Sequence, residues 1–274
     1  METSIDPTTD HEMARLAARE HVLRFLSLAA SDPTAKRFED IFAPDFQELA
    51  CAAACHLAAD PTLRAAQLAP GEVSPGELDL APLVRALDVP RPQFVEEHTQ
   101  VFGLVVSKEC PPYEVQYCPQ TFSVFRSQRL ADIAGFYHAF GVTPGRDAPE
   151  RVDHIACELE FLAWLVAKER HARAGDGDDW AERVAICRDA QRDFVAEHVA
   201  WWVPAFARAL GERARTLEPP SVFQAAFADA LAALIPAERA ALDVAPPQVL
   251  AEPQPDEEQA EGGCAGCGSE EGGS

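Results

Sequence analysis

The amino-acid sequence predicts an all-α protein, a helical bundle of about ten helices in two packed halves joined by a proline-rich loop, with a disordered acidic C-terminal tail. Three observations lead to this prediction. Apolar residues recur at helical spacing through most of the chain. No segment shows the sustained alternation of β-branched residues that is typical of strands. Prolines and glycines fall between the apolar segments, where they end helices.

The first predicted half spans about residues 1–105. Alanine, leucine and arginine favour one long helix over 10–30, which Asp32-Pro33 ends. Shorter helices are expected between the prolines that follow, over 34–42, 45–58, 78–87 and 94–102. The stretch 106–118 then contains Cys110-Pro111-Pro112, and adjacent prolines exclude a regular helix there. We therefore expect a hinge loop at 106–118.

The second predicted half, residues 119–242, has longer helices. Aromatic and aliphatic residues over 122–140 lie near one face of a helix that Gly141 ends. The next helix carries a buried stripe at spacings of three and four residues, made of Val152, Ile155, Leu159, Leu162 and Val166. A third helix runs over 184–201 with a kink expected at Pro204, and a fourth apolar segment spans 222–235. We find no internal repeat, which disfavours a solenoid.

Charge limits the classes of partner. The chain has 274 residues, with 23 Lys and Arg against 45 Asp and Glu, a formal net charge of −22. Such a surface repels phosphate backbones and anionic membranes, so we expect no nucleic-acid partner and no stable membrane insertion. Residues 243–274 hold eight acids, no base and no aromatic residue, and this composition predicts a disordered tail. Removing those eight acids leaves 37 acids and 23 bases in the body, which favours cationic partners.

The opening residues METSIDPTTDHE carry acids where a secretory signal carries bases before an apolar run. The longest apolar run, near 161–167, is far shorter than the roughly 20 residues of a membrane-spanning helix. We therefore expect a cytoplasmic protein.

Signatures of catalysis are missing from the sequence: it contains no GxSxG, no glycine-rich phosphate loop and no HExxH. We accordingly expect no enzyme, no catalytic residues and no cofactor. The alternative is a helical metal-dependent enzyme, because His154 and Glu158 are four residues apart and share a helix face. One such pair is a weak metal signal. In a purely structural interpretation, Asp153 is the N-cap of the helix and Glu158 and Glu160 are solvated.

A second candidate site is Cys264-x-x-Cys267, a pair of cysteines whose spacing suits zinc binding or a redox pair. A closed zinc site needs four ligands, and Cys51, Cys55 and His56 are the nearest complement by type. The role of this pair stays open.

A third candidate is the loop of residues 109–117, in which Tyr113 and Tyr117 flank Glu114 on a stretch that prolines hold extended. Tyrosine combines apolar area with a hydroxyl group, so such a loop suits peptide recognition. The alternative is that both tyrosines fill the seam between the two halves.

Four segments, in order and spacing, resemble the TorD/DmsD family of redox-enzyme maturation chaperones, which is related to the NarJ-type nitrate reductase assembly factors. They are Glu97-His98-Thr99-Gln100-Val101-Phe102, Pro111-Pro112-Tyr113-Glu114 with Tyr117, Ala131-Asp132-Ile133-Ala134-Gly135-Phe136-Tyr137 with Phe140-Gly141, and Asp153-His154-Ile155-Ala156 with Glu158-Leu159-Glu160-Phe161-Leu162. The likeness covers about residues 12–240. It implies an all-helical, non-enzymatic, cytoplasmic chaperone, a monomer or dimer. The partners that the resemblance implies are the twin-arginine signal peptide and the apoprotein of a molybdopterin oxidoreductase, bound before cofactor insertion.

The resemblance also implies a set of binding residues. Tyr113, Glu114 and Tyr117 match the family's proline-tyrosine-glutamate loop. Asp153 and His154 match its Asp-His pair, which is implicated in signal-peptide binding. The chain departs from the family where His98 and Gln100 replace Tyr and Arg, and where Arg151 and Val152 stand in place of a common proline. These departures bear on the client and on the shape of the pocket's entrance.

Physical reasoning agrees with this implied partner. Carboxylates bind guanidinium groups through charge-assisted hydrogen bonds, and an aromatic-lined helical groove accepts an apolar run. We hypothesise that Asp153 and Glu158 supply the anionic end of the site and that His154 is sensitive to pH near neutrality.

Overall fold

The computed structural model describes residues 7–103, 107–120, 122–143, 145, 150–175 and 177–254, and every regular element within them is helical. The all-α prediction is therefore confirmed. In order, the elements are α1 (Pro7–Ala29), η1 (Lys36–Phe42), α2 (Pro44–Ala59), α3 (Pro61–Arg64), η2 (Pro75–Glu77), α4 (Ala81–Arg85), α5 (Arg91–Phe102), η3 (Glu114–Tyr117), α6 (Ser123–Ala139), α7 (Ile155–Ala174), α8 (Trp180–Phe194), η4 (Val195–Val199), α9 (Val203–Thr216) and α10 (Val222–Ala241).

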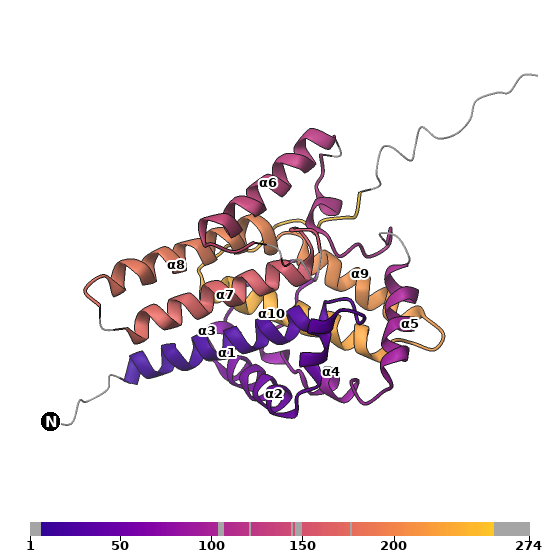
Figure 1. Ribbon diagram of the computed structural model, residues 1–274, viewed down its shortest axis with the longest axis horizontal. Helices are drawn as coiled ribbons and strands as arrows, with labels where there is room; N and C mark the ends of the chain where they lie inside the picture. Colours follow the sequence, from indigo (N-terminus) through magenta and orange to yellow (C-terminus); the bar gives the residue numbers. More distant parts are fainter. Residues whose placement is uncertain are drawn as a thin grey trace, which may run out of the picture.

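The core is built around α1, α7 and α10. α1 packs along α7 and α2, α7 also packs along α8, and α10 packs against α9, α3 and α4, as the ribbon shows (Figure 1). Helices from both predicted halves thus contribute to one hydrophobic cluster. Four residues of the predicted stripe, Ile155, Leu159, Leu162 and Val166, are buried on α7 at 1% exposure or less, whereas Val152 lies before the helix and is half-buried. None of the helices in the described ranges is both long and apolar enough to cross a membrane.

A buried ion pair joins the first and last long helices. Arg19 of α1 donates from Nε and Nη2 to the two carboxylate oxygens of Glu238 of α10, at 2.9 and 2.7 Å. The same guanidinium donates to the Gln191 side chain of α8 at 3.0 Å. Because both charged groups are buried, removing one partner would leave the other unpaired in the core.

The segment before Pro204 differs from the prediction of one kinked helix. α8 ends at Phe194, a single π-helical turn spans Val195–Val199, and α9 begins at Val203. Pro204 therefore lies in the first turn of a new helix, where its missing N–H group would have no intrahelical acceptor. The chain bends at 200–202 instead, and the bend leaves Trp202 fully buried.

The first part of the predicted disordered tail is ordered. Residues 243–254 lie on the body, where Val244 and Leu250 pack against the core and the Gln254 N–H donates to the Gln116 carbonyl at 2.7 Å. Leu250 lies over Gly71, whose φ is 86° and where an added Cβ would lie 2.8 Å from Leu250 Cδ1. The prediction missed this contact because it used the average composition of 243–274, to which these few apolar side chains contribute little. Residues 255–274, with Cys264 and Cys267, lie outside the described residues.

Candidate functional site

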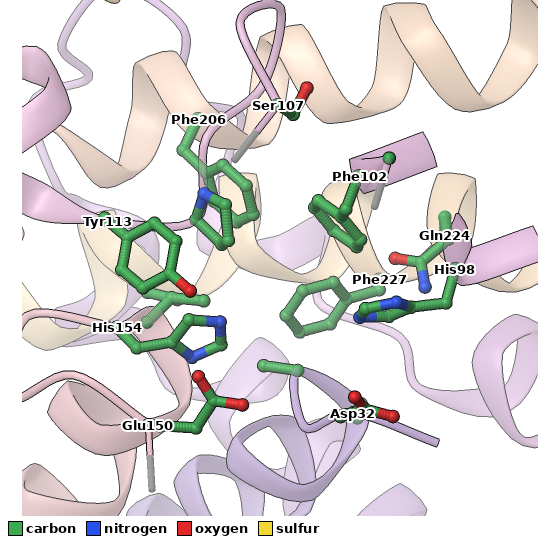
Figure 2. A pocket seen from close by; sticks show the side chains of 15 residues that line it. Asp32, His98, Phe102, Ser107, Tyr113, Glu150, His154, Phe206, Gln224 and Phe227 are labelled. Atoms are coloured by element: carbon green, nitrogen blue, oxygen red, sulfur yellow. The ribbon is translucent and has the colours of Figure 1, made fainter. Parts of the chain in front are cut away.

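A cavity of about 370 Å³ opens where the start of α7 meets the ends of α1 and α5. Figure 2 shows the side chains around it, which come from stretches far apart in the sequence. Its polar and aromatic lining includes Asp32 after α1, His98 and Phe102 of α5, Tyr113 of the proline loop, Glu150 and His154 before α7, Phe206 of α9, and Phe227 of α10. The cavity is thus a product of the tertiary fold and not of any one segment.

The proline loop is held against the start of α7 by a short antiparallel bridge between Tyr113 and His154. The Ile155 N–H donates to the Pro112 carbonyl and the Glu114 N–H to the Asp153 carbonyl, both at 3.0 Å. Proline keeps the loop extended, so its backbone is ready for strand-like pairing. The bridge places the Tyr113 ring edge-on to the His154 imidazole, with 5.0 Å between centroids, at the cavity wall.

Asp153 is a structural link between the loop and the start of α7. Its side chain has 0% exposure and accepts two hydrogen bonds from Arg151, at 3.0 and 2.7 Å, and one from the Val115 N–H at 3.2 Å. The N-cap of α7 is His154, whose Nδ1 accepts from the Ala156 N–H at 3.1 Å. The cap expected at Asp153 is therefore wrong by one residue, because Val115, far away in sequence, takes the Asp153 carboxylate.

His154 does not titrate near neutral pH, contrary to our expectation. Burial, with the positive charge of neighbouring groups such as His98 and Arg151, lowers its pKa to about 3. Because Nδ1 accepts a backbone hydrogen bond, the proton of the neutral ring lies on Nε2. His154 thus presents a neutral ring to the cavity (Figure 2).

Glu114 and Glu158 lie behind the cavity, each with 0% exposure. Glu114 accepts from His198 Nδ1 at 3.1 Å and pairs with Arg129 at 3.3 Å. Glu158 accepts from the Trp202 indole at 3.2 Å. Burial and the nearby Glu114 raise the pKa of Glu158 well above its usual value, so this group stays protonated. Glu158 is therefore neither solvated, as the structural interpretation expected, nor a negative charge at the cavity.

The two tyrosines of the loop divide between the two alternatives. Tyr113 is half-buried and lines the cavity. Tyr117 is 1% exposed, and its ring lies 5.3 Å from that of Trp202 in the interior. Tyr113 is thus placed for contact with a ligand, whereas Tyr117 fills the core.

Two cavity carboxylates were not singled out by sequence reasoning. One Asp32 oxygen accepts from the Thr34 N–H and hydroxyl, both at 2.7 Å, while no described residue donates a hydrogen bond to the Glu150 carboxylate. Burial raises the pKa of Glu150, and the negative charge of Asp32 raises it further. Burial also acts to raise the pKa of Asp32, but the bonds from Thr34 outweigh it and the net shift is downward. The cavity therefore holds two mutually repelling acids.

The rest of the cavity wall offers no compensating cation. Burial lowers the pKa of His98 as it does that of His154, so both imidazoles are neutral at pH 7. Among the described residues, neither Lys nor Arg lines this cavity. In the sequence, Asp32 predicts only a helix end and Glu150 resembles the chain's many other acids. Their pairing arises from tertiary contacts alone.

The described part of the chain offers no further ligands for the metal sites considered from the sequence. There, no group of three or more His, Cys, Asp or Glu side chains is arranged to hold a metal ion. His154 and Glu158 bond instead to the Ala156 N–H and to Trp202. On α2, Cys51 is half-buried and Cys55 is exposed.

Such a cavity can bind a cation through its carboxylates and an aliphatic or planar group through its aromatic rings. Guanidinium satisfies both, since it forms paired hydrogen bonds with carboxylates and stacks on aromatic faces. Two ionised groups that lack a cationic partner in the free chain would gain one on binding.

The comparisons with known proteins agree with the sequence motifs. The family model described as "Nitrate reductase delta subunit" matches residues 74–208. The chain is 38% identical over 120 residues to the selenate reductase assembly chaperone protein of Thauera selenatis, which is 44% of this chain and 56% of the relative. It is 43% identical over 81 residues to the chlorate reductase assembly chaperone protein of Ideonella dechloratans, 30% and 39% of the two chains.

A third match is the chaperone protein TorD of Vibrio cholerae serotype O1 (strain M66-2), 28% identical over 121 residues, or 44% of this chain and 50% of the relative. The chain thus spans about half the length of the curated relatives it matches. Taken with the four motifs, these matches support a relation to the TorD/DmsD family of redox-enzyme maturation chaperones.

Proposed function

We propose that this chain is a cytoplasmic chaperone and not an enzyme. It binds the twin-arginine signal peptide and apoprotein of a molybdopterin-containing oxidoreductase, and it holds this precursor until the cofactor has been inserted. The names of the relatives support the class, because those relatives are assembly chaperones of selenate and chlorate reductases. The cytoplasmic site of action is the one that the family resemblance implies.

The observation that carries the proposal is the pair of acids in the cavity. Asp32 and Glu150 line one aromatic-lined cavity, and burial and the negative charge of Asp32 raise the pKa of Glu150. A bound guanidinium group would relieve this repulsion and form charge-assisted hydrogen bonds, each contributing about 1.5–3 kcal/mol. The formal charge of −22 would in addition speed the approach of a basic peptide.

The residues that the resemblance implicates keep two kinds of role in this proposal. Tyr113 and His154 line the cavity and contact the peptide directly. Glu114, Tyr117, Asp153 and Glu158 are positioning residues, because their bonds and packing fix the proline loop and the start of α7.

Co-purification from the native host tests the proposal. The tagged full chain should bring down a large molybdopterin oxidoreductase precursor that retains its leader, as identified by mass spectrometry. The D32N/E150Q double variant should recover much less of it. The matched control is D229N/E212Q, which removes the same charge at two exposed surface ion pairs. Equal recovery by D32N/E150Q and by the control would contradict the proposal.

A further inference from the structure

A second cavity adjoins the first along α7. Its volume is about 610 Å³, and its lining includes Val142 after α6 and Cys157, Phe161 and Trp164 of α7. Glu150 lines both cavities and is the point where they meet. The electrostatics of Glu150 are consistent with this position, because its pKa is raised by burial and by Asp32 of the first cavity and lowered by Arg37 of the second.

One stripe of α7 runs through both cavities. His154, Cys157, Phe161 and Trp164 are spaced by three, four and three residues, which is the spacing of a single helix face. The ten steps from His154 to Trp164 rise about 15 Å along the helix axis. An extended peptide covers that distance in about five residues and a helical one in about ten.

The chemistry of the lining changes along this stripe. The first cavity carries two acids, and no described Lys or Arg lines it. In the second, Arg37 and Glu160 neutralise each other through an ion pair at 2.8 Å. The Lys168 ammonium lies 4.7 Å from the centroid of the Trp164 ring, which disfavours another cation there. Trp164 supplies aromatic surface, since it is 43% exposed, and Phe161 lies beneath it in the core at 2% exposure. The second cavity is thus suited to apolar side chains.

We infer that the two cavities form one continuous groove for a single peptide, whose arginine side chains lie between Asp32 and Glu150 and whose apolar residues lie on Trp164. This inference rests on the proposed function and deepens it, because it sets the spacing of basic and apolar residues in the bound segment. Basic residues must lie about five to ten positions from the apolar contact.

Two synthetic peptides test the inference on the full chain by fluorescence anisotropy. The first has two adjacent arginines followed by ten leucines and alanines, and the second has serines and glycines in place of that apolar stretch. W164A should weaken binding of the first peptide about tenfold, as expected for loss of a central aromatic contact. The control is W180A, since Trp180 on α8 is 45% exposed and lies outside both cavities. It should leave the affinity unchanged.

Each outcome separates the groove from the proposed function. If W164A and W180A bind the first peptide equally well, the groove is wrong. If in that case D32N and E150Q still weaken binding, the proposed function holds without the continuous groove. If D32N and E150Q change neither peptide's affinity, the proposed function itself is contradicted. Unchanged helical circular dichroism excludes misfolding of W164A, whose side chain is nearly half exposed.

Tryptophan emission gives an independent readout. In the W180A background, Trp164 is the tryptophan with the largest exposure among those described. Its emission should shift to shorter wavelength with the first peptide, and W164A/W180A should lose that shift. A shift of equal size in the double variant would contradict the inference.

Discussion

Two sets of carboxylates lie within a short distance of the start of α7 and differ in their partners. Asp153, Glu114 and Glu158 are fully buried, and each is bonded to groups of the protein itself. Asp32 and Glu150 line an open cavity, where burial and the charge of Asp32 raise the pKa of Glu150 and no described Lys or Arg contributes to the lining. The residues of the first set belong to the family motifs, whereas those of the second set have carboxylates that a ligand can reach. Motif membership and ligand contact are therefore separate properties in this fold.

The largest expected effect is on stability, when a carboxylate of the buried set is removed. Asp153→Ala removes the acceptor of the Val115 N–H and of Arg151, so it should lower the free energy of unfolding by about 2–3 kcal/mol. Asp229→Ala removes an exposed acid paired with Arg215 and should cost less than about 1 kcal/mol. Urea unfolding of both variants measures the difference. Equal losses would mean that Asp153 is not the structural link described above.

A smaller effect tests the protonation of Glu158. Its pKa is raised in the folded state, so above about pH 4.3 the unfolded chain releases a proton that the folded chain keeps. Stability is then lost as the pH rises, by at most about 1.4 kcal/mol per unit. Glu158→Gln lacks this loss, so it should be more stable than the natural chain at pH 7–8, with the gap closing toward pH 4. Lower stability of the variant at all these pH values would show that Glu158 is ionised.

The third prediction concerns the cavity set. In the proposed site, Glu150 would bind a guanidinium group only when ionised, and its pKa is raised. Affinity for an arginine-bearing peptide should be complete above that pKa and fall about tenfold as the pH drops through it, beginning above the usual glutamate range near 4.3. Anisotropy titrations across pH 4–8 measure this, and E150Q should flatten the curve. With its pKa at about 3, His154 adds no step near pH 6.5, and such a step in E150Q would contradict its neutrality.

The sequence predicts those features of the fold that depend on local pattern. The apolar stripe of α7 and the irregular proline loop follow from spacing and from backbone limits, and both are present. The N-cap prediction was wrong because the Val115 N–H competes for Asp153 from a remote loop. The cavity acids were missed because the ends of α1 and α5, the proline loop and α10 converge only in the folded chain.

Calorimetric titration of the full chain with the peptide of two adjacent arginines and an apolar stretch tests the central claim most directly. The claim predicts that D32N/E150Q weakens binding at least about tenfold, since it removes charge-assisted hydrogen bonds of about 1.5–3 kcal/mol each. It also predicts that the surface control D229N/E212Q binds like the natural chain. Equal affinity of D32N/E150Q and the natural chain would contradict the assignment of this cavity as the arginine-binding site.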